Sequence, residues 1–440
     1  MPKLLLIELN EFNPDLILDV SRKLGLKNLP KLLALPHCAT TTQDEIEHQG
    51  LDPWVQWANV HSGLPSHQHG VRRLGDTARQ TAPQIWNRVA AMGYSWAAWG
   101  VMNAPRGDMQ GCKLYVPDPW SYDERATPPQ LETLLALPRH MATHYLDPGA
   151  SKLLLSTLRS ASYFLPPSQW PIAARFAAKL LSGIAACGAN VHTFAGLLDY
   201  LGALVFLREK MRSKPDLSVI FLNLVAHSQH HFWTAGRDYD QRLLYAIRVA
   251  DAIVALLLES LDPDEAVICM NSMRQENVAG RGFFVYRQID PDRTINRLGV
   301  AGGTVQQCMT NESHILFDTV QEADAAEQQL RSLTLGDGSP LLFLERDHPT
   351  KVFAQICIDN PVPPDARIVG TGIDVAFYDL FALVCERTGA HTQTGDLYYK
   401  SIDIGPGPLF NHQIGDLIVD HFKNGTHRNA VVETVSNQEA

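Results

Sequence analysis

The sequence is poor in the features that mark several large protein classes. Its seven cysteines are scattered over 440 residues without a CxxC pair, which argues against a disulfide framework or a zinc ribbon. No apolar run reaches the roughly 18 residues that a transmembrane helix needs, and the first residues turn polar too soon for a signal peptide. The net charge of −10 leaves no basic stripe for nucleic-acid phosphates. We therefore expect a cytoplasmic protein with no stable membrane insertion and no nucleic-acid partner.

What the sequence does contain is typical of an α/β domain. Apolar residues make up 45% and charged residues 19%, as in ordinary globular proteins. Lys3–Leu9 is an apolar run that indicates a buried parallel strand, and Asn13 with Pro14 predicts the start of a helix. Leu217–Val225 and Ala266–Met270 are further buried-strand candidates. The pattern predicts a mainly parallel central sheet flanked by helices.

Two stretches interrupt this pattern within a single domain spanning 1–440. Residues 121–210 are rich in Leu, Ala and aromatics at helical spacing, which predicts a helical insertion or cap. This stretch is apolar enough to form a homodimer interface or to cover an acyl chain. Residues 280–375 show short strands and turns and predict a second, smaller insertion. Helical spacing resumes at Leu380–Arg387.

Polar residues gather where the predicted strands end. Asn10–Glu11, Ala226–His231 and Asn271–Gln275 each follow a buried strand. In open α/β sheets, binding sites form beyond the carboxyl ends of the strands. These three clusters are therefore expected to lie together at one site.

Six segments in order along the chain resemble motifs of the alkaline phosphatase superfamily, particularly its type I phosphodiesterase and nucleotide pyrophosphatase branch. They are LLLIELNEFNPDLI, HSGLPSHQHGV, MGYSWAAWGVMNAP, NLVAHSQHHFW, VICMNSMRQ and GAHTQTGDLYY. The resemblance implies the fold of that family, with two divalent metals held by carboxylates and histidines.

The resemblance also exposes what this chain lacks. The positions that align with the family's metal carboxylates, its nucleophile and one of its histidines are occupied by Asn10, Pro53, Ala226, Ser272 and Met273. Two divalent ions about 4 Å apart would repel by roughly 16 kcal/mol at an effective dielectric of 20. Without ligand carboxylates to offset that repulsion, a two-metal site is not expected.

Two histidines of the family pattern are kept, His230 and His391. The resemblance places them on the same metal, so we expect at most one divalent ion, zinc or iron, with a third ligand. Our choice for that ligand is Glu8, a carboxylate inside an otherwise apolar strand. The alternatives are His227, Glu11 and Asp52.

The remaining candidate residues surround these ligands. We assign catalytic roles to His230, Asp52 and Asn10. Without a metal, His230 would act as a general base. Six are expected to contact an anionic small-molecule substrate: Arg274, Gln56, Asn271, Gln275, Trp54 and His227.

Three functions fit these observations. The first is a divergent hydrolase or group transferase that acts on a phosphorylated, sulfated or glycan-precursor molecule with at most one metal. The second is a catalytically inactive protein that binds a ligand on the same scaffold. The third is an orthodox two-metal phosphodiesterase, which would need Glu11, Asp52 and Asp238 to converge.

Overall fold

The computed structural model describes residues 1–42, 51–144, 155–160, 167, 170–188, 191–309 and 311–436. The remaining parts of the predicted 121–210 insertion, at 145–154, 161–166, 168–169 and 189–190, lie outside the described residues. The chain divides into two compact units. The first comprises Met1–Ala136, Leu154–Asn277 and Gly389–Ala440, and the second comprises Leu137–Leu153 and Val278–Thr388.

The first unit is built on an eight-stranded sheet with the order β19-β2-β18-β6-β1-β5-β3-β4. Neighbours from β6 to β4 run parallel, whereas β18 is antiparallel to both β6 and β2. The strands are β1 (Leu4–Leu9), β2 (His37–Thr41), β3 (Trp96–Val101), β4 (Cys112–Pro117), β5 (Leu217–Leu222), β6 (Ala266–Met270), β18 (Thr394–Lys400) and β19 (Leu409–Phe410). The predicted fold class, a mainly parallel sheet flanked by helices, is confirmed.

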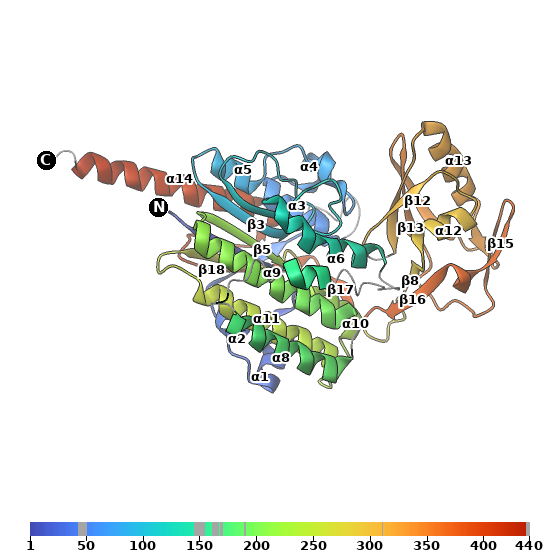
Figure 1. The fold of residues 1–440 in the computed structure, drawn as a ribbon, viewed down its shortest axis with the longest axis horizontal. Coiled ribbons are helices and arrows are strands. Elements are labelled where there is room, and N and C mark those ends of the chain that lie inside the picture. Colours follow the sequence, from blue (N-terminus) through green and yellow to red (C-terminus); the bar gives the residue numbers. More distant parts are fainter. Residues whose placement is uncertain are drawn as a thin grey trace. The chain divides into compact units, whose positions relative to one another are not determined.

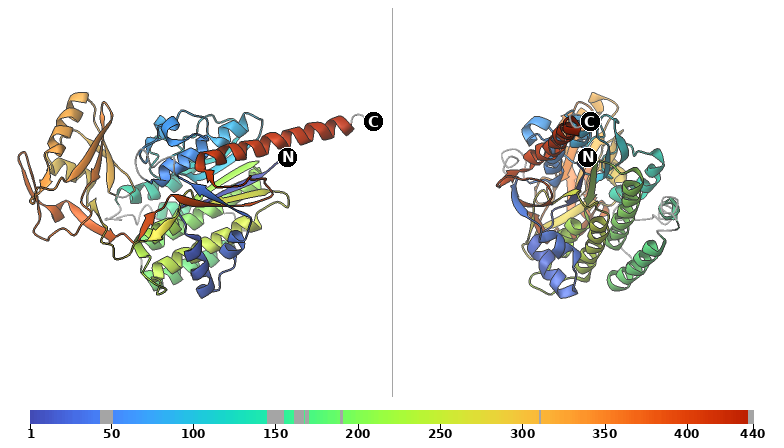
Figure 2. Two further views of the ribbon diagram at one scale, coloured as in Figure 1. Left: turned by 180° about the vertical axis from the view of Figure 1, so that it is seen from behind. Right: turned by 90° about the vertical axis from the view of Figure 1, so that its left-hand side faces the viewer.

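Helices cover both faces of this sheet (Figures 1 and 2). Every residue of β1, β5 and β6 is buried, as expected for central parallel strands. One face carries α1 (Pro14–Leu24), α2 (Asn28–Leu33), α8 (Trp170–Cys187), α9 (Val191–Ser213), α10 (Leu224–Phe232) and α11 (Gln241–Glu259). The other carries α3 (Pro53–Ser62), α4 (Ser66–His69), α5 (Ile85–Ala90) and α14 (Asn411–Ser436).

The turn between β1 and α1 forms as the sequence predicts. The side chain of Asn13 accepts a hydrogen bond from the backbone N–H of Leu16, and Pro14 occupies the first turn. The helix ends at Gly25, which adopts φ +66°, a left-handed conformation that favours glycine. These caps fix the position of residues 10–13, which carry the site described below.

The second unit has small antiparallel sheets and its own apolar core. Its strands are β8 (Phe284–Gln288), β9 (Thr304–Gln307), β10 (Glu312–Leu316), β11 (Thr334–Leu335), β12 (Leu342–His348), β13 (Lys351–Ile356), β14 (Arg367–Gly370), β15 (Ile373–Ala376) and β16 (Phe381–Glu386). Helices α12 (Pro291–Arg297) and α13 (Val320–Arg331) pack with them, and α6 (Glu132–Thr143) runs from the first unit into this one. The predicted helix at Leu380–Arg387 is wrong, because this segment forms β16 and pairs with β8. Among the described residues, no helix is both long and apolar enough to cross a bilayer.

Candidate metal centre

Three side chains from separate elements of the first unit converge at the carboxyl end of the sheet. Glu11 follows β1, His230 lies on α10, and His391 ends the short strand β17 (Gly389–His391), which pairs with β7 (Gln275–Asn277). Glu11 Oε2 lies 2.9 Å from Nε2 of each histidine, and the two Nε2 atoms are 3.3 Å apart. In the part of the chain that the structure describes, these residues form the one group of three or more His, Cys, Asp or Glu with ligand atoms close enough to share a metal.

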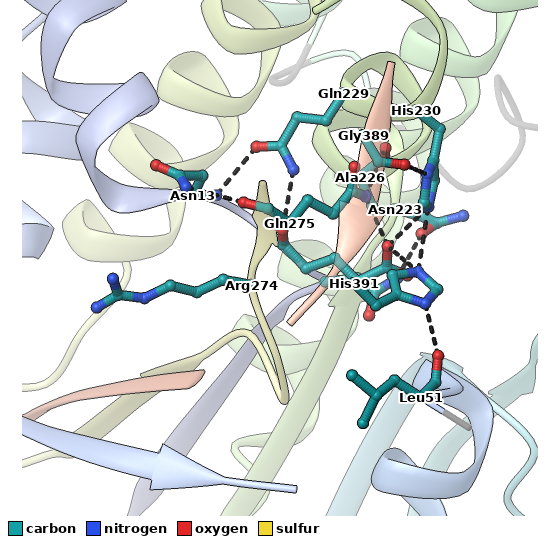
Figure 3. A network of polar contacts seen from close by, with 12 residues as sticks. Asn13, Leu51, Asn223, Ala226, Gln229, His230, Arg274, Gln275, Gly389 and His391 are labelled. Atoms are coloured by element: carbon teal, nitrogen blue, oxygen red, sulfur yellow. Dashed lines mark hydrogen bonds and ion pairs between the residues drawn. The ribbon is translucent and has the colours of Figure 1, made fainter. Parts of the chain in front are cut away.

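The other ring nitrogens fix the tautomers of both histidines. His230 Nδ1 lies 2.9 Å from the carbonyl oxygen of Gly389, and His391 Nδ1 lies 2.6 Å from that of Leu51 (Figure 3). Carbonyl oxygens only accept hydrogen bonds, so each Nδ1 carries a hydrogen, and in the neutral form of each ring Nε2 then keeps the lone pair that faces Glu11. Two lone pairs and a carboxylate in contact repel one another unless a cation or a proton lies between them. This arrangement, with Nδ1–H bonded to the backbone, is the usual orientation of histidine at a metal.

Glu11 is held in an unusual backbone conformation. Its φ is +51°, in the left-handed region that residues with a Cβ seldom adopt, and its N–H donates to the carbonyl of Asn271. Such strain persists only where the surroundings impose it, and it is frequent at functional sites. Burial alone would raise the pKa of the Glu11 carboxyl, but His391 and His230, when protonated at Nε2, outweigh burial through their charge and hydrogen bonds and hold the pKa well below its ordinary value. A metal ion would take the place of those protons. Glu11 is therefore a buried carboxylate anion facing two imidazoles.

Asn10 braces Glu11 from behind. Trp57 Nε1, which can only donate, lies 2.7 Å from Asn10 Oδ1 and so fixes the orientation of the amide. The amide nitrogen then donates to Glu11 Oε1 at 2.7 Å and to Asn223 Oδ1 at 2.8 Å. Asn10, predicted as catalytic, lies beside the triad and positions its carboxylate.

Gln275 secures the same carboxylate from the other side. Its Nε2 donates to Glu11 Oε2 at 2.6 Å and to the carbonyl of Ala226 at 3.1 Å. Gln275 was predicted to contact substrate, whereas in the structure its side chain is hydrogen-bonded to the carboxylate of Glu11. Gln229 adds a further tie by donating to the backbone carbonyl of Glu11 (Figure 3).

Gly389 leaves no room for a larger residue next to this support. A Cβ there would lie 2.1 Å from Gln275 Oε1 and 2.8 Å from the carbonyl oxygen of Gln229. Gly389→Ala is therefore expected to displace Gln275 and the carbonyl that orients His230, and to weaken zinc binding about 10- to 100-fold, as loss of supporting contacts does elsewhere. Calorimetric titration with zinc measures the change. The matched control is Gly405→Ala, where no atom lies within 4 Å of the new Cβ; equal affinities of the two variants would contradict this account.

Glu8 does not join the triad, so the structure corrects the predicted third ligand. The carboxylate is completely buried and lies 2.6 Å from Nε2 of His61, which is also completely buried. Residues 8 and 10 share one face of a strand, but Glu11 falls beyond the end of β1, where the left-handed turn redirects its side chain toward the histidines. Glu11, considered as an alternative, takes the place assigned to Glu8.

Arg274 and Asn271, both predicted to contact substrate, are engaged elsewhere. The guanidinium of Arg274 donates two 2.6 Å hydrogen bonds to the buried carboxylate of Asp396 and points away from His391 (Figure 3). Asn271 donates to the Phe12 carbonyl and accepts from the N–H of Asp396. The structure therefore places both residues in a network around Asp396.

The remaining predicted residues lie along α3 and α10. Asp52 is the residue before α3, next to Leu51, whose carbonyl accepts from His391. Gln56 Oε1 accepts from Asn411 and Asn59 inside the protein, and Trp54 Nε1 donates to the Arg72 carbonyl.

His227 stacks on the ring of His192, with centroids 4.7 Å apart, and lies outside the triad. Neither Asp52 nor Asp238 joins the triad, so the convergence required by the two-metal reading is not seen among the described residues.

The comparisons with known proteins can now be set beside this geometry. No protein-family model and no curated protein sequence matches the chain. Phosphonoacetate hydrolase from Sinorhizobium meliloti 1021, solved with phosphonoformate, is 12% identical with a TM-score of 0.43, and the match covers 96% of each chain. Human ectonucleotide pyrophosphatase/phosphodiesterase 5 is 8% identical with a TM-score of 0.41, over 96% of this chain and 95% of that one. Both proteins are members of the alkaline phosphatase superfamily, which the sequence motifs resemble. Similarity at this level assigns no activity to this chain.

Proposed function

We propose that the chain is a one-metal enzyme that hydrolyses an anionic small molecule, such as a phosphate or sulfate ester. The observation that carries the proposal is the convergence of three atoms that can each supply an electron pair to a metal, Glu11 Oε2 and the Nε2 atoms of His230 and His391. Two imidazoles and one carboxylate suit zinc or ferrous iron. The three residues would hold that ion, and it would supply Lewis acidity toward a substrate oxygen and toward water.

The protein's own residues prepare the site for this role. Glu11 balances part of the charge of a bound cation, and Asn10 with Gln275 prevents its carboxylate from rotating. The backbone carbonyls of Gly389 and Leu51 keep both imidazoles in the tautomer that leaves Nε2 unprotonated. Orientation fixed before binding lowers the reorganisation that binding or reaction requires.

The position expected to hold a nucleophile supports water rather than a side chain as the attacking group. It is occupied by Pro53, the first residue of α3, which has no nucleophilic atom. Asp52 immediately precedes Pro53, and we propose its carboxylate as the general base. Its neighbour Leu51 contacts His391 through its backbone carbonyl, which places this stretch of the chain beside the triad. Asp52→Asn is expected to reduce turnover at least about 100-fold without loss of zinc binding.

A turnover assay tests the proposal. Protein stripped with a chelator and reloaded with zinc or ferrous iron is assayed on p-nitrophenyl phosphate, bis(p-nitrophenyl) phosphate and p-nitrophenyl sulfate. We expect turnover of at least one ester in the loaded protein only, and its loss in His391→Ala but not in Gly405→Ala. Equal turnover in stripped and loaded protein would refute a metal-dependent reaction.

A ligand-binding protein without turnover is the second candidate. Asn10, Pro53 and Ser272 stand where the resemblance implies reactive or ligating groups, which favours this alternative. It predicts that loaded protein binds inorganic phosphate or sulfate in calorimetry yet turns over none of the three esters.

A further inference from the structure

Asn223 immediately precedes α10, but its side chain does not cap that helix. An asparagine in this position usually accepts a hydrogen bond from a backbone N–H of the first turn. The side chain of Asn223 makes no such bond, and the carboxylate of Asp199 on α9 accepts the N–H of Leu224 at 3.0 Å instead. The start of α10 is therefore secured without the Asn223 amide, which is turned toward Asn10 (Figure 3).

The orientation of the Asn223 amide follows from its neighbours. Trp57 Nε1 donates to Asn10 Oδ1, so the nitrogen of the Asn10 amide faces the other way. That nitrogen donates to Glu11 Oε1 at 2.7 Å and to Asn223 Oδ1 at 2.8 Å. A reversed Asn223 amide would bring two N–H donors together, so its oxygen faces Asn10 and its nitrogen points away from Asn10. Asn223 thus ends a chain of hydrogen bonds that begins at Trp57.

The nitrogen of the Asn223 amide is a hydrogen-bond donor that the protein itself does not use. Asn223 is half-buried, and its Nδ2 is neither enclosed in the core nor bonded to an acceptor among the described residues. The neighbouring amides have no such donor left. Both hydrogens of Asn10 are engaged, and Gln275 Nε2 donates to Glu11 Oε2 and to the Ala226 carbonyl. A donor that is oriented by its neighbours but lacks an acceptor is available to a ligand.

We propose that Asn223 Nδ2 donates to a non-bridging oxygen of the substrate's phosphoryl or sulfuryl group when that group is bound at the metal centre. Because the proposed function brings such a group to the site, this role of Asn223 rests on that function. Asn223 Oδ1 and Glu11 Oε1 accept from the same nitrogen of Asn10, which places the Asn223 amide beside the carboxylate of the triad. An amide held in one orientation before binding needs little reorganisation to accept an oxyanion.

Calorimetric titration of the zinc-loaded protein with inorganic phosphate and with sulfate tests this role. We expect Asn223→Ala to bind both anions about 10- to 100-fold more weakly, the usual effect of losing a hydrogen bond to a charged group. Its affinity for zinc should stay within about threefold of the parent protein, because Asn10 still donates to Glu11 Oε1. The matched control is Asn28→Ala at the start of α2. The Asn28 amide donates to Asp251 at 2.9 Å, so this variant should keep both affinities.

The outcomes separate this role from the proposed function. Equal anion affinities of Asn223→Ala and the parent protein would overturn the role of Asn223 and leave the proposed function intact. A loss of zinc affinity as large as the loss of anion affinity would also overturn it, by showing that Asn223 supports the metal ligands and not the substrate. Loaded parent protein that binds neither anion and turns over none of the three esters would refute the proposed function, and this role with it.

Discussion

Glu11→Gln is expected to lower the affinity for zinc by about 100- to 1,000-fold. Structural zinc sites with four ligands bind with roughly 10–16 kcal/mol, or about 2.5–4 kcal/mol for each ligand, and 1.4 kcal/mol corresponds to a factor of ten. Glutamine keeps the size of the side chain but removes the negative charge that faces His230 and His391. Competition against a chromogenic chelator measures the affinity of the two proteins.

Glu8→Gln is the matched control for that experiment. Glu8 is a buried carboxylate three residues away, but it faces His61 and not the triad. The zinc affinity of this variant should stay within about threefold of the parent protein, well inside the loss expected for a ligand. If Glu8→Gln lost zinc and Glu11→Gln did not, the predicted ligand would have been right and the triad wrong.

The second large effect concerns the pair formed by Glu8 and His61. Both side chains are completely buried, and neither Glu8 Oε2 nor His61 Nδ1 has a hydrogen-bond partner among the described residues. His61→Leu leaves the carboxylate of Glu8 buried without its 2.6 Å partner. Removing one member of a buried ion pair typically costs about 3–5 kcal/mol, a large part of the roughly 5–15 kcal/mol that stabilises a domain. Urea unfolding gives the free energy for each protein.

The double variant Glu8→Leu, His61→Leu separates the charge from the packing. Replacing a whole buried pair by apolar residues is often close to neutral, so most of the loss in the single variant should be recovered. His61 also packs against Trp57 and Trp86, with ring centroids 6.1 and 5.3 Å away, and leucine keeps part of that contact. A single variant that loses less than about 1 kcal/mol would mean that the pair is not a buried ion pair.

The sheet was the most predictable part of the fold because its signals are local. Ala266–Met270 is a strand with the predicted ends, and Asn13 with Pro14 starts α1 as their side-chain chemistry requires. Leu380–Arg387 could not be assigned in this way. A short apolar run fits either a helix or a strand, and the pairing of β16 with β8, about a hundred residues earlier, decides between them.

The cluster of Glu11, His230 and His391 was predictable in outline, but its carboxylate was not the one chosen from the sequence. His230 and His391 stand at positions that the family pattern marks, and the strand ends beside them could be located from the apolar runs. The choice between Glu8 and Glu11 depended on a left-handed residue after β1, and glutamate gives no local signal for that conformation. The partner of Glu8, His61, lies 53 positions away on α3, and no periodicity links the two.

Metal content per chain tests the central claim most directly. Purified protein is dialysed against zinc or ferrous iron, freed of excess metal and analysed by elemental mass spectrometry, together with the His230→Ala, His391→Ala double variant. One metal per chain in the parent protein and none in the variant is the predicted result. No metal in either protein would contradict a metal centre and leave a proton between Glu11 and the histidines, and two metals per chain would contradict a one-metal site.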